Sequence, residues 1–270
     1  FGSSSLRVEP SLVSVHRSRA VLPLPPMATS MRPMDLESQM DLRGISKANV
    51  QLRFVQKVYG IVSVQLLFTA MVAGLCCGPW QSTVLSLVER HPSAFQWGSL
   101  IALLLAMLVC SAGKKSYPVN FYGLGLLTTV MAFDVGVICA MVSAVGLGSL
   151  IAQAALITGL LVVGLTIYTF RSKRNFSWLG AALFPILFGM IGFSLLSIFI
   201  PALRSGWIHL AYSFFGAAVF CLYLVYDTWR LANELNVDDY VEGAIQLYMD
   251  IINLFLQILD ILLSLAKDRR

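Results

Sequence analysis

Between residues 239 and 267, an otherwise apolar segment carries polar side chains at regular intervals. Their spacing alternates between four and three residues, which places them on one face of an α-helix. They are Asp239, Gly243, Gln246, Asp250, Asn253, Gln257, Asp260, Ser264 and Lys267. The other faces are apolar, so the pattern predicts a helix in an apolar medium whose single polar stripe is directed inward. Ionisable groups on such a stripe are candidates for a functional site.

Four acids lie within apolar segments of the chain, namely Asp134, Asp227, Asp250 and Asp260. If the N-terminus faces the cytosol, Asp227 lies near the cytosolic boundary, and Asp250 lies about 9 Å from that boundary at about 1.5 Å per residue. The same arithmetic places Asp134 and Asp260 roughly 22 to 24 Å from it. The sequence therefore predicts two levels of acids, with Asp227 and Asp250 able to meet.

Two carboxyl groups that share a low-dielectric site cannot both ionise cheaply. We therefore expect the Asp227/Asp250 pair to hold one proton and to sense pH. Oxygen ligands without sulfur or imidazole suit a hard cation such as Ca²⁺. Because a permeation path requires weak sites, we expect the pair to bind Ca²⁺ weakly. The residues expected to line the path are Gln246, Asn253, Gln257, Asp260 and Asp134.

A purely structural interpretation of these acids stays open. Asp227 could cap a turn at the membrane edge with Thr228 and Arg230, and Asp260 could lie at a fraying helix end. Asp250 fits this interpretation least, because it is the deepest acid from the cytosolic side and has polar neighbours on both adjacent turns.

The elements that must position these residues are membrane spans. The chain is 57% apolar and 12% charged, with a mean hydropathy of +0.77, whereas a soluble domain carries about a quarter charged residues. Seven apolar runs approach the roughly 20 residues needed to cross a bilayer. They are 56–78, 96–113, 118–140, 147–169, 178–202, 207–229 and 244–266. The connections near 79–95 and 230–243 are too short for a globular headpiece. This predicts an all-α polytopic membrane protein without resident cofactors.

The basic residues indicate the topology of the spans. They concentrate before the first span and after the second and fourth, at Arg43, Lys47, Arg53, Lys57, Lys114, Lys115, Arg171, Lys173 and Arg174. Since basic loops face the cytosol, we expect a cytosolic N-terminus and no nucleic-acid partner. Seven full crossings would place the basic C-terminus on the far side, so either the last span re-enters or the rule is locally broken.

Residues 1–45 lack periodic apolar character, and we expect them to form a disordered tail ahead of a membrane domain at 46–270. The sequence opens on Phe1, and a start at Met27, Met31 or Met34 would make the preceding residues untranslated. A transit peptide is an alternative interpretation of the same segment, because Arg and Ser outnumber the acids there.

Several motifs bear on other classes of function. Tyr226-Asp227 and Pro201-Ala202-Leu203 resemble motifs of intramembrane aspartyl proteases, but their order is wrong, and Asp250 lacks the required Gly-x-Gly before it. Phosphate-binding, HExxH and Ser–His motifs are missing from the sequence, so we expect no enzymatic activity. A proton-coupled cation carrier would also need buried acids and stays an alternative, although carriers usually show repeated halves and the sequence shows no repeat. A non-conducting scaffold that suppresses cell death through membrane-protein partners stays open, since Gly189 and Gly192 could serve helix association.

Several motifs resemble those of the transmembrane Bax-inhibitor-motif family, specifically its lifeguard branch, over residues 43–266. They are Arg53-Phe54-Val55-Gln56-Lys57-Val58-Tyr59, Gln65-Leu66-Leu67, Tyr117-Pro118-Val119-Asn120, Tyr168-Thr169-Phe170-Arg171-Ser172-Lys173, Phe176-Ser177, Tyr226-Asp227-Thr228, Asp239-Tyr240 through Ala244, Leu247-Tyr248-Met249-Asp250 and Asn253-Leu254-Phe255. Together these motifs are specific, although each alone would be weak.

The resemblance implies a seven-helix bundle in which the last, polar-striped helix is central. It also implies a pH-sensitive Ca²⁺ leak across endoplasmic reticulum or Golgi membranes that regulates cell death, with Asp227 and Asp250 as the pH-sensing pair. Some family members latch this pair with an arginine from the second helix, but the second span here has no basic residue before Lys114. The chain also departs from the family pattern at Asn175 and Trp229.

Overall fold

The computed structural model describes residues 33–113, 119–200, 203 and 206–268. The chain divides into two units, Phe1–Ser46 and Lys47–Arg270, and the second contains the membrane spans. Of the expected tail, residues 1–32 lie outside the described residues. Residues 33–45 are helical, because the first helix begins at Pro33.

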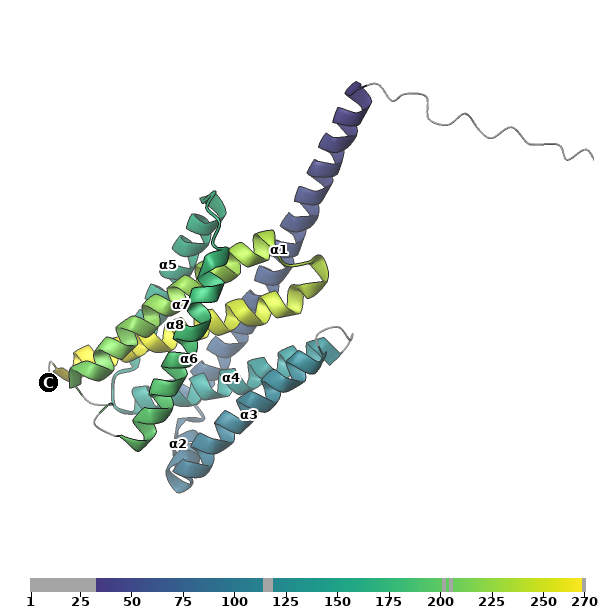
Figure 1. The fold of residues 1–270 in the computed structure, drawn as a ribbon. Coiled ribbons are helices and arrows are strands. Elements are labelled where there is room, and N and C mark those ends of the chain that lie inside the picture. Colours follow the sequence, from purple (N-terminus) through teal and green to yellow (C-terminus); the bar gives the residue numbers. More distant parts are fainter. Residues whose placement is uncertain (1–32, 114–118, 201–202, 204–205, 269–270) are drawn as a thin grey trace, which may run out of the picture. The chain divides into compact units, whose positions relative to one another are not determined.

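The described residues form α-helices connected by short turns, with one short 3₁₀ segment and no strand (Figure 1). In chain order the elements are α1 (Pro33–Cys77), α2 (Gln81–Arg90), α3 (Pro92–Gly113), α4 (Val119–Ala144), α5 (Gly148–Arg171), α6 (Ser177–Phe199), α7 (Gly206–Asn233), η2 (Val237–Asp239) and α8 (Tyr240–Asp268). Within the described residues, seven helices are long and apolar enough to cross a membrane. Each predicted span overlaps one of these seven, which confirms the all-α polytopic fold.

Helix α2 was not expected, because it occupies the connection predicted as a loop. It is only ten residues long, and polar residues make up both of its ends, so it is too short and too polar for a membrane span. Val84 is buried against Val137 and Ala140 of α4, and Gln81 donates a hydrogen bond to the carbonyl of Ala140 (3.3 Å). Packing on α4 therefore stabilises a helix that length and hydropathy alone do not predict.

Helix α8 occupies the centre of the second unit. Leu247 packs with Phe54 of α1 and Leu224 of α7. On another side, Tyr248 packs in a cluster with residues of α3 and α4, and Leu254 joins a third cluster that includes residues of α5, α6 and α7. Residues of α8 thus contribute to three separate clusters of the core, which agrees with the expected central position of the last helix.

The outward faces of the spans are apolar. Leu67 of α1, Leu108 of α3, Leu160 of α5 and Phe184 of α6 each expose more than 60% of their surface. Apolar exposure spread over many helices is what a protein surrounded by hydrocarbon presents. The five cysteines are free.

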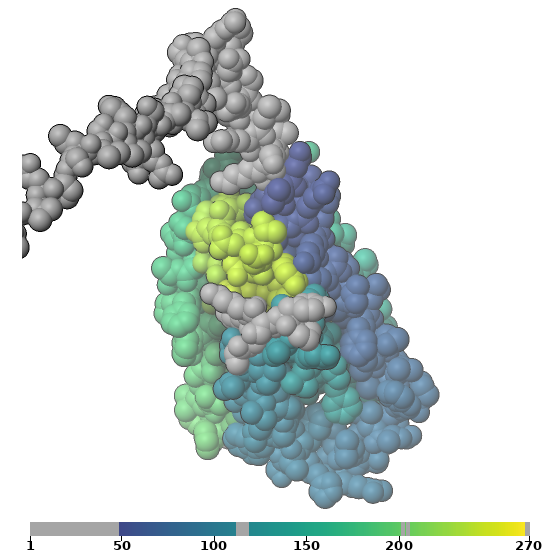
Figure 2. All heavy atoms as spheres, turned by 90° about the vertical axis from the view of Figure 1, so that its right-hand side faces the viewer, coloured from purple at the N-terminus to yellow at the C-terminus, as the bar shows by residue number. Residues whose placement is uncertain are grey.

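The turn between α7 and α8 sets the register of the two helices. The amide groups of Glu234 and Leu235 both donate to the carbonyl of Arg230 (2.8 and 3.0 Å), which closes the end of α7. The short η2 segment follows and leads into α8. Beside this turn, Lys57 Nζ of α1 lies 3.2 Å from the ring centroid of Tyr240, a cation–π contact. Figure 2 shows this end of α8 at the surface next to α1.

Candidate functional site between helices α7 and α8

Helices α7 and α8 run antiparallel and side by side (Figure 1). The polar stripe of α8 faces α7, and α7 carries a matching series on the facing side. This series consists of His209, Ser213, Gly216, Tyr223, Asp227 and Arg230. Its members are three, four or seven residues apart, which places them on one face of a helix. The spacing that identified the polar stripe of α8 could therefore have identified this series as well. Of this series, the sequence predicted only Asp227 as a member of the functional pair.

The carboxyl groups of Asp227 and Asp250 are hydrogen-bonded to each other. Both side chains are buried, with 8% and 6% of their surface exposed. A hydrogen bond between two carboxyl groups requires a proton on one of them. Oδ2 of Asp250 is buried and has no hydrogen-bond partner among the described residues. Two carboxyl groups that share one proton would make a contact of this kind.

Three other ionisable groups surround this pair. Tyr223, one turn before Asp227 on α7, interacts electrostatically with both carboxyl groups. Arg230 and Glu242 lie close enough to act on Asp227 with opposite signs. Asp227 therefore has one positively and one negatively charged neighbour.

Arg230 connects the two helices directly. Its Nη1 donates to Oε1 of Gln246 (3.0 Å) and its Nη2 donates to Oε1 of Glu242 (3.1 Å). The guanidinium reaches across to α8, so it does not form the local turn with Asp227 and Thr228 that the structural interpretation required. The hydroxyl of Thr228 instead lies 3.3 Å from that of Tyr59 on α1.

Farther along the stripe, α8 again meets polar or small residues of α7. The side-chain amide of Gln257 lies directly over Gly216, where a Cβ would meet its Cδ at 2.7 Å. Ser213 donates a hydrogen bond to Asp260, and Nδ1 of His209 lies 3.4 Å from the same carboxylate. His209 therefore has a partner inside the α7–α8 interface.

Asn253 and Asp134, which were expected to line the path, form hydrogen bonds with residues outside α7. Asn253 donates its side-chain N–H to the carbonyl of Met249, one turn earlier in α8 (2.8 Å). Asp134 hydrogen-bonds with Ser99 of α3. The structure thus brings Gln246, Asp250, Gln257 and Asp260 onto one interface with α7, and it directs Asp134 toward a different helix.

A buried polar network joins α1 to α4 and α8. Nε2 of Gln65 donates to the hydroxyl of Thr128 (2.7 Å), and the hydroxyl groups of Thr69 and Tyr248 lie 2.8 Å apart. All four side chains are buried. Sequence reasoning missed this network, because single polar residues in apolar runs give no periodic signal.

The site offers few ligands for a tightly bound metal. Among the residues that the structure describes, no group of three or more His, Cys, Asp or Glu is arranged to hold a metal ion. A cation at the pair would receive the oxygens of two carboxyl groups once their shared proton is lost. Two carboxylates supply at most about four oxygens, whereas a tight Ca²⁺ site has six to eight.

Comparisons with known proteins agree with the motifs. A family model described as "Inhibitor of apoptosis-promoting Bax1" matches residues 51–267. The chain is 36% identical to Protein LIFEGUARD 4 of Arabidopsis thaliana over 211 residues, which cover 77% of this chain and 83% of that protein. It is 36% identical to a BI1-like protein of the same plant over 224 residues, covering 81% and 84%. A Golgi anti-apoptotic protein of Vaccinia virus (strain Lister) is 34% identical over 232 residues, covering 81% and 89%. None of these names denotes a catalytic activity.

Proposed function

Because the chain belongs to the family of Bax inhibitors and lifeguard proteins, we propose that it is a pH-sensitive Ca²⁺ leak channel that restrains cell death. One observation carries the proposal. Two buried carboxyl groups, Asp227 on α7 and Asp250 on α8, are hydrogen-bonded to each other within apolar helices. Buried acids in a membrane span are costly and commonly mark an ion path or a proton relay.

The shared proton gives the pair two states that differ in packing. With the proton present, one hydrogen bond holds α7 to α8 at this level. When the proton leaves, two negative charges face each other in an apolar setting, and their repulsion favours separation of the helices or entry of a cation. Protonation thereby biases the contact between α7 and α8, which is the bistable element of the gate.

The path would follow the interface between α7 and α8 beyond the pair. Gln246 lies on one side of the pair, and Gln257 and Asp260 lie on the other, all facing α7. Their oxygens are neutral or singly charged, so they form weak sites from which a cation can leave again. Asp134 faces α3 and would not take part in this route.

Arg230 would hold the closed arrangement. It is the basic residue of α7 that bridges to α8, through Gln246 and Glu242, one turn from Asp227. This arrangement would replace the latch that some family members build from the second helix. Since all of its partners belong to the α7–α8 hairpin, the latch and the gate would move together.

The names of the relatives suggest which membrane of the cell contains the protein. One is named for the Golgi and for anti-apoptotic action, so we propose a Golgi or endoplasmic reticulum membrane with the N-terminus in the cytosol. A steady leak from such a store lowers its Ca²⁺ content, and we propose that this lower content, together with membrane-protein partners, limits cell death.

Purified protein in liposomes tests the proposal. The liposomes are loaded with a fluorescent Ca²⁺ indicator. Ca²⁺ entry should be faster with the protein than in liposomes that contain the indicator but no protein, and it should change with external pH. Lack of flux at every pH, combined with retained protection of cells from death, would contradict a leak and favour a non-conducting scaffold. A variant carrying Asp227→Asn and Asp250→Asn separates these alternatives, because a scaffold should still bind its partners.

A further inference from the structure

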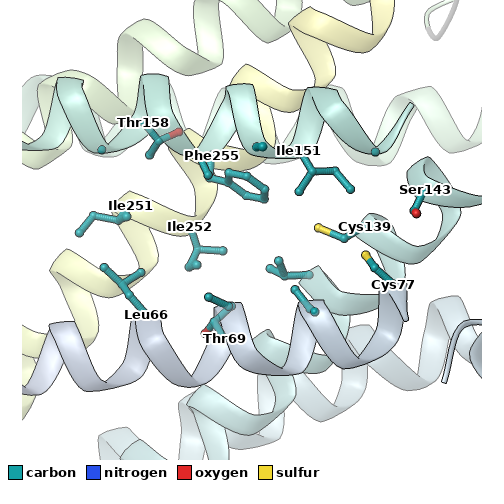
Figure 3. Close-up of a pocket in the computed structure, with 18 residues that line it drawn as sticks. Leu66, Thr69, Cys77, Cys139, Ser143, Ile151, Thr158, Ile251, Ile252 and Phe255 are labelled. Carbon is teal, nitrogen blue, oxygen red and sulfur yellow. The ribbon is translucent and has the colours of Figure 1, made fainter. Parts of the chain in front are cut away.

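A cavity of about 550 Å³ lies between α1, α4, α5 and α8. Figure 3 shows Leu66 and Thr69 of α1 along one edge and Ile151 and Thr158 of α5 along the opposite edge. Between them lies Ile252 of α8. All four helices are long and apolar enough to cross a membrane, so the cavity lies at the depth of the hydrocarbon layer.

The cavity borders the face of α8 that points away from the acid pair. Ile251, Ile252 and Phe255 line it, whereas Asp250 and Gln257 face α7. Helix α8 is therefore packed against α7 on its polar side and borders an open space on its apolar side.

The lining is poorly suited to water. Its surface is almost entirely apolar, and its two threonine hydroxyl groups already have partners. Thr69 donates to the carbonyl of Gln65 and contacts the hydroxyl of Tyr248, while Thr158 donates to the carbonyl of Ala154. A buried water molecule needs two to four polar partners, and besides these two hydroxyl groups the lining offers the hydroxyl of Ser143 and the thiols of Cys77 and Cys139, which are few for a space of this size.

A space of this size also does not favour staying empty. It is several times larger than the roughly 150 Å³ apolar cavity that stays dry and binds benzene. Atoms around an empty space lose their dispersion contacts, so an apolar occupant is favoured. The cavity is not enclosed. Next to its walls, Leu67 of α1 and Leu156 of α5 expose 71% and 65% of their surface, so hydrocarbon chains of the bilayer reach both helices.

We propose that this cavity binds the hydrocarbon tail of a membrane lipid, which enters between α1 and α5 and lies against α8. The walls carry no charged side chain, which fits the acyl part of the lipid and not its headgroup. The bound tail would support α8 from the side opposite Asp250. This binding is independent of whether the protein conducts Ca²⁺.

Glycines in the walls allow the cavity to be filled by mutation. An added Cβ at Gly159 of α5 or at Gly74 of α1 would meet no atom within 4 Å, so Gly159→Leu and Gly74→Leu can extend into the space from opposite walls. Gly164 provides a matched control, because it lies on α5, is equally open, and does not line the cavity.

The experiment uses the full chain in liposomes with a photoreactive fatty acid, followed by mass spectrometry of the labelled peptides. We expect labelling of lining residues that saturates and is displaced by excess oleate. In Gly159→Leu and Gly74→Leu, the leucine side chain occupies space that several methylene groups of the fatty acid would fill. We therefore expect labelling to fall roughly tenfold in these variants. Gly164→Leu should be labelled as strongly as the unmodified protein.

Three results would overturn the proposal. Labelling of the lining that rises in proportion to the probe and resists oleate would mean contact with bulk lipid only. Unchanged labelling in both filled variants, with thermal unfolding showing that they are folded, would exclude the cavity as the site. Attachment of a photoreactive leucine at position 66 to another polypeptide chain would show that a protein helix occupies the space.

Discussion

The carboxyl groups of Asp227 and Asp250 are hydrogen-bonded across the interface between α7 and α8, although the two residues lie on different helices separated by a turn. Both are almost completely buried. The contact needs a proton, so the stability of this helix pair and its protonation are linked.

The first prediction concerns stability and pH. Carboxyl groups in the unfolded chain lose their protons near pH ~4, whereas on our proposal the folded Asp227/Asp250 pair retains one. Above that pH the folded state binds the extra proton, so its stability falls as pH rises, by at most about 1.4 kcal/mol per pH unit. The fall ends where the folded pair also loses the proton. Thermal unfolding in detergent between pH 5 and 9 measures it.

Asp250→Asn provides the comparison for this experiment. Its amide can donate to Asp227 without a shared proton, so the pH-dependent part of the stability should disappear. An equal fall in stability with pH in Asp250→Asn and in the unmodified protein would show that another group binds the proton.

The second prediction concerns Arg230. Replacing it with glutamine removes the two hydrogen bonds of 3.0 and 3.1 Å to Gln246 and Glu242. Because the ion pair is about a quarter exposed on either side, we expect a loss of about 1 kcal/mol. The loss of positive charge beside Asp227 should also shift the pH midpoint of the flux upward. Arg171→Gln makes the same charge change at an exposed position of α5 and should leave this midpoint in place.

The third prediction tests the packing of α3 against α4. A Cβ added at Gly123 would lie 3.1 Å from Cα and 3.3 Å from the backbone nitrogen of Cys110, so the helices must move apart. Gly123→Ala should therefore destabilise the protein by about 1 to 3 kcal/mol. Gly125→Ala, on the same helix, meets no atom within 4 Å and should stabilise it by up to about 1 kcal/mol. Thermal unfolding that showed the same effect for both variants would contradict this close approach.

The sequence predicted the structure correctly where polar residues recur at the helical period or where apolar runs have the length of a membrane span. The spacing from Asp239 to Lys267 correctly indicated a helix with one polar face, and span lengths predicted the seven long helices. The partners of that face were harder to predict. His209 and Ser213 belong to a helix that is apolar on average, and their roles depend on which helix α8 packs against.

The estimated depth of a side chain in the membrane did not predict which helix the side chain contacts. Asp134 and Asp260 have similar estimated depths, but the side chain of Asp134 meets Ser99 of α3, and that of Asp260 meets Ser213 of α7. Rise per residue gives the level of a side chain in the membrane. Its direction depends on how the helix is rotated in the bundle, which tertiary packing determines.

This difference supplies the fourth prediction. If the ion path follows the α7–α8 interface, Asp260→Asn removes a charge from the path and should lower Ca²⁺ flux several-fold at constant pH. Asp134→Asn makes the same substitution at the α3–α4 contact and should leave flux within about twofold of the unmodified protein. Liposome flux assays compare the two, and a larger loss in Asp134→Asn would place the path elsewhere.

The most direct measurement is Ca²⁺ flux into liposomes between pH 5 and 8 for the unmodified protein, Asp227→Asn, Asp250→Asn and the double variant. The account predicts that flux changes with pH in the unmodified protein, that each single variant shifts or flattens this change, and that the double variant conducts equally at every pH. A double variant that retained the original pH profile would contradict a gate formed by Asp227 and Asp250.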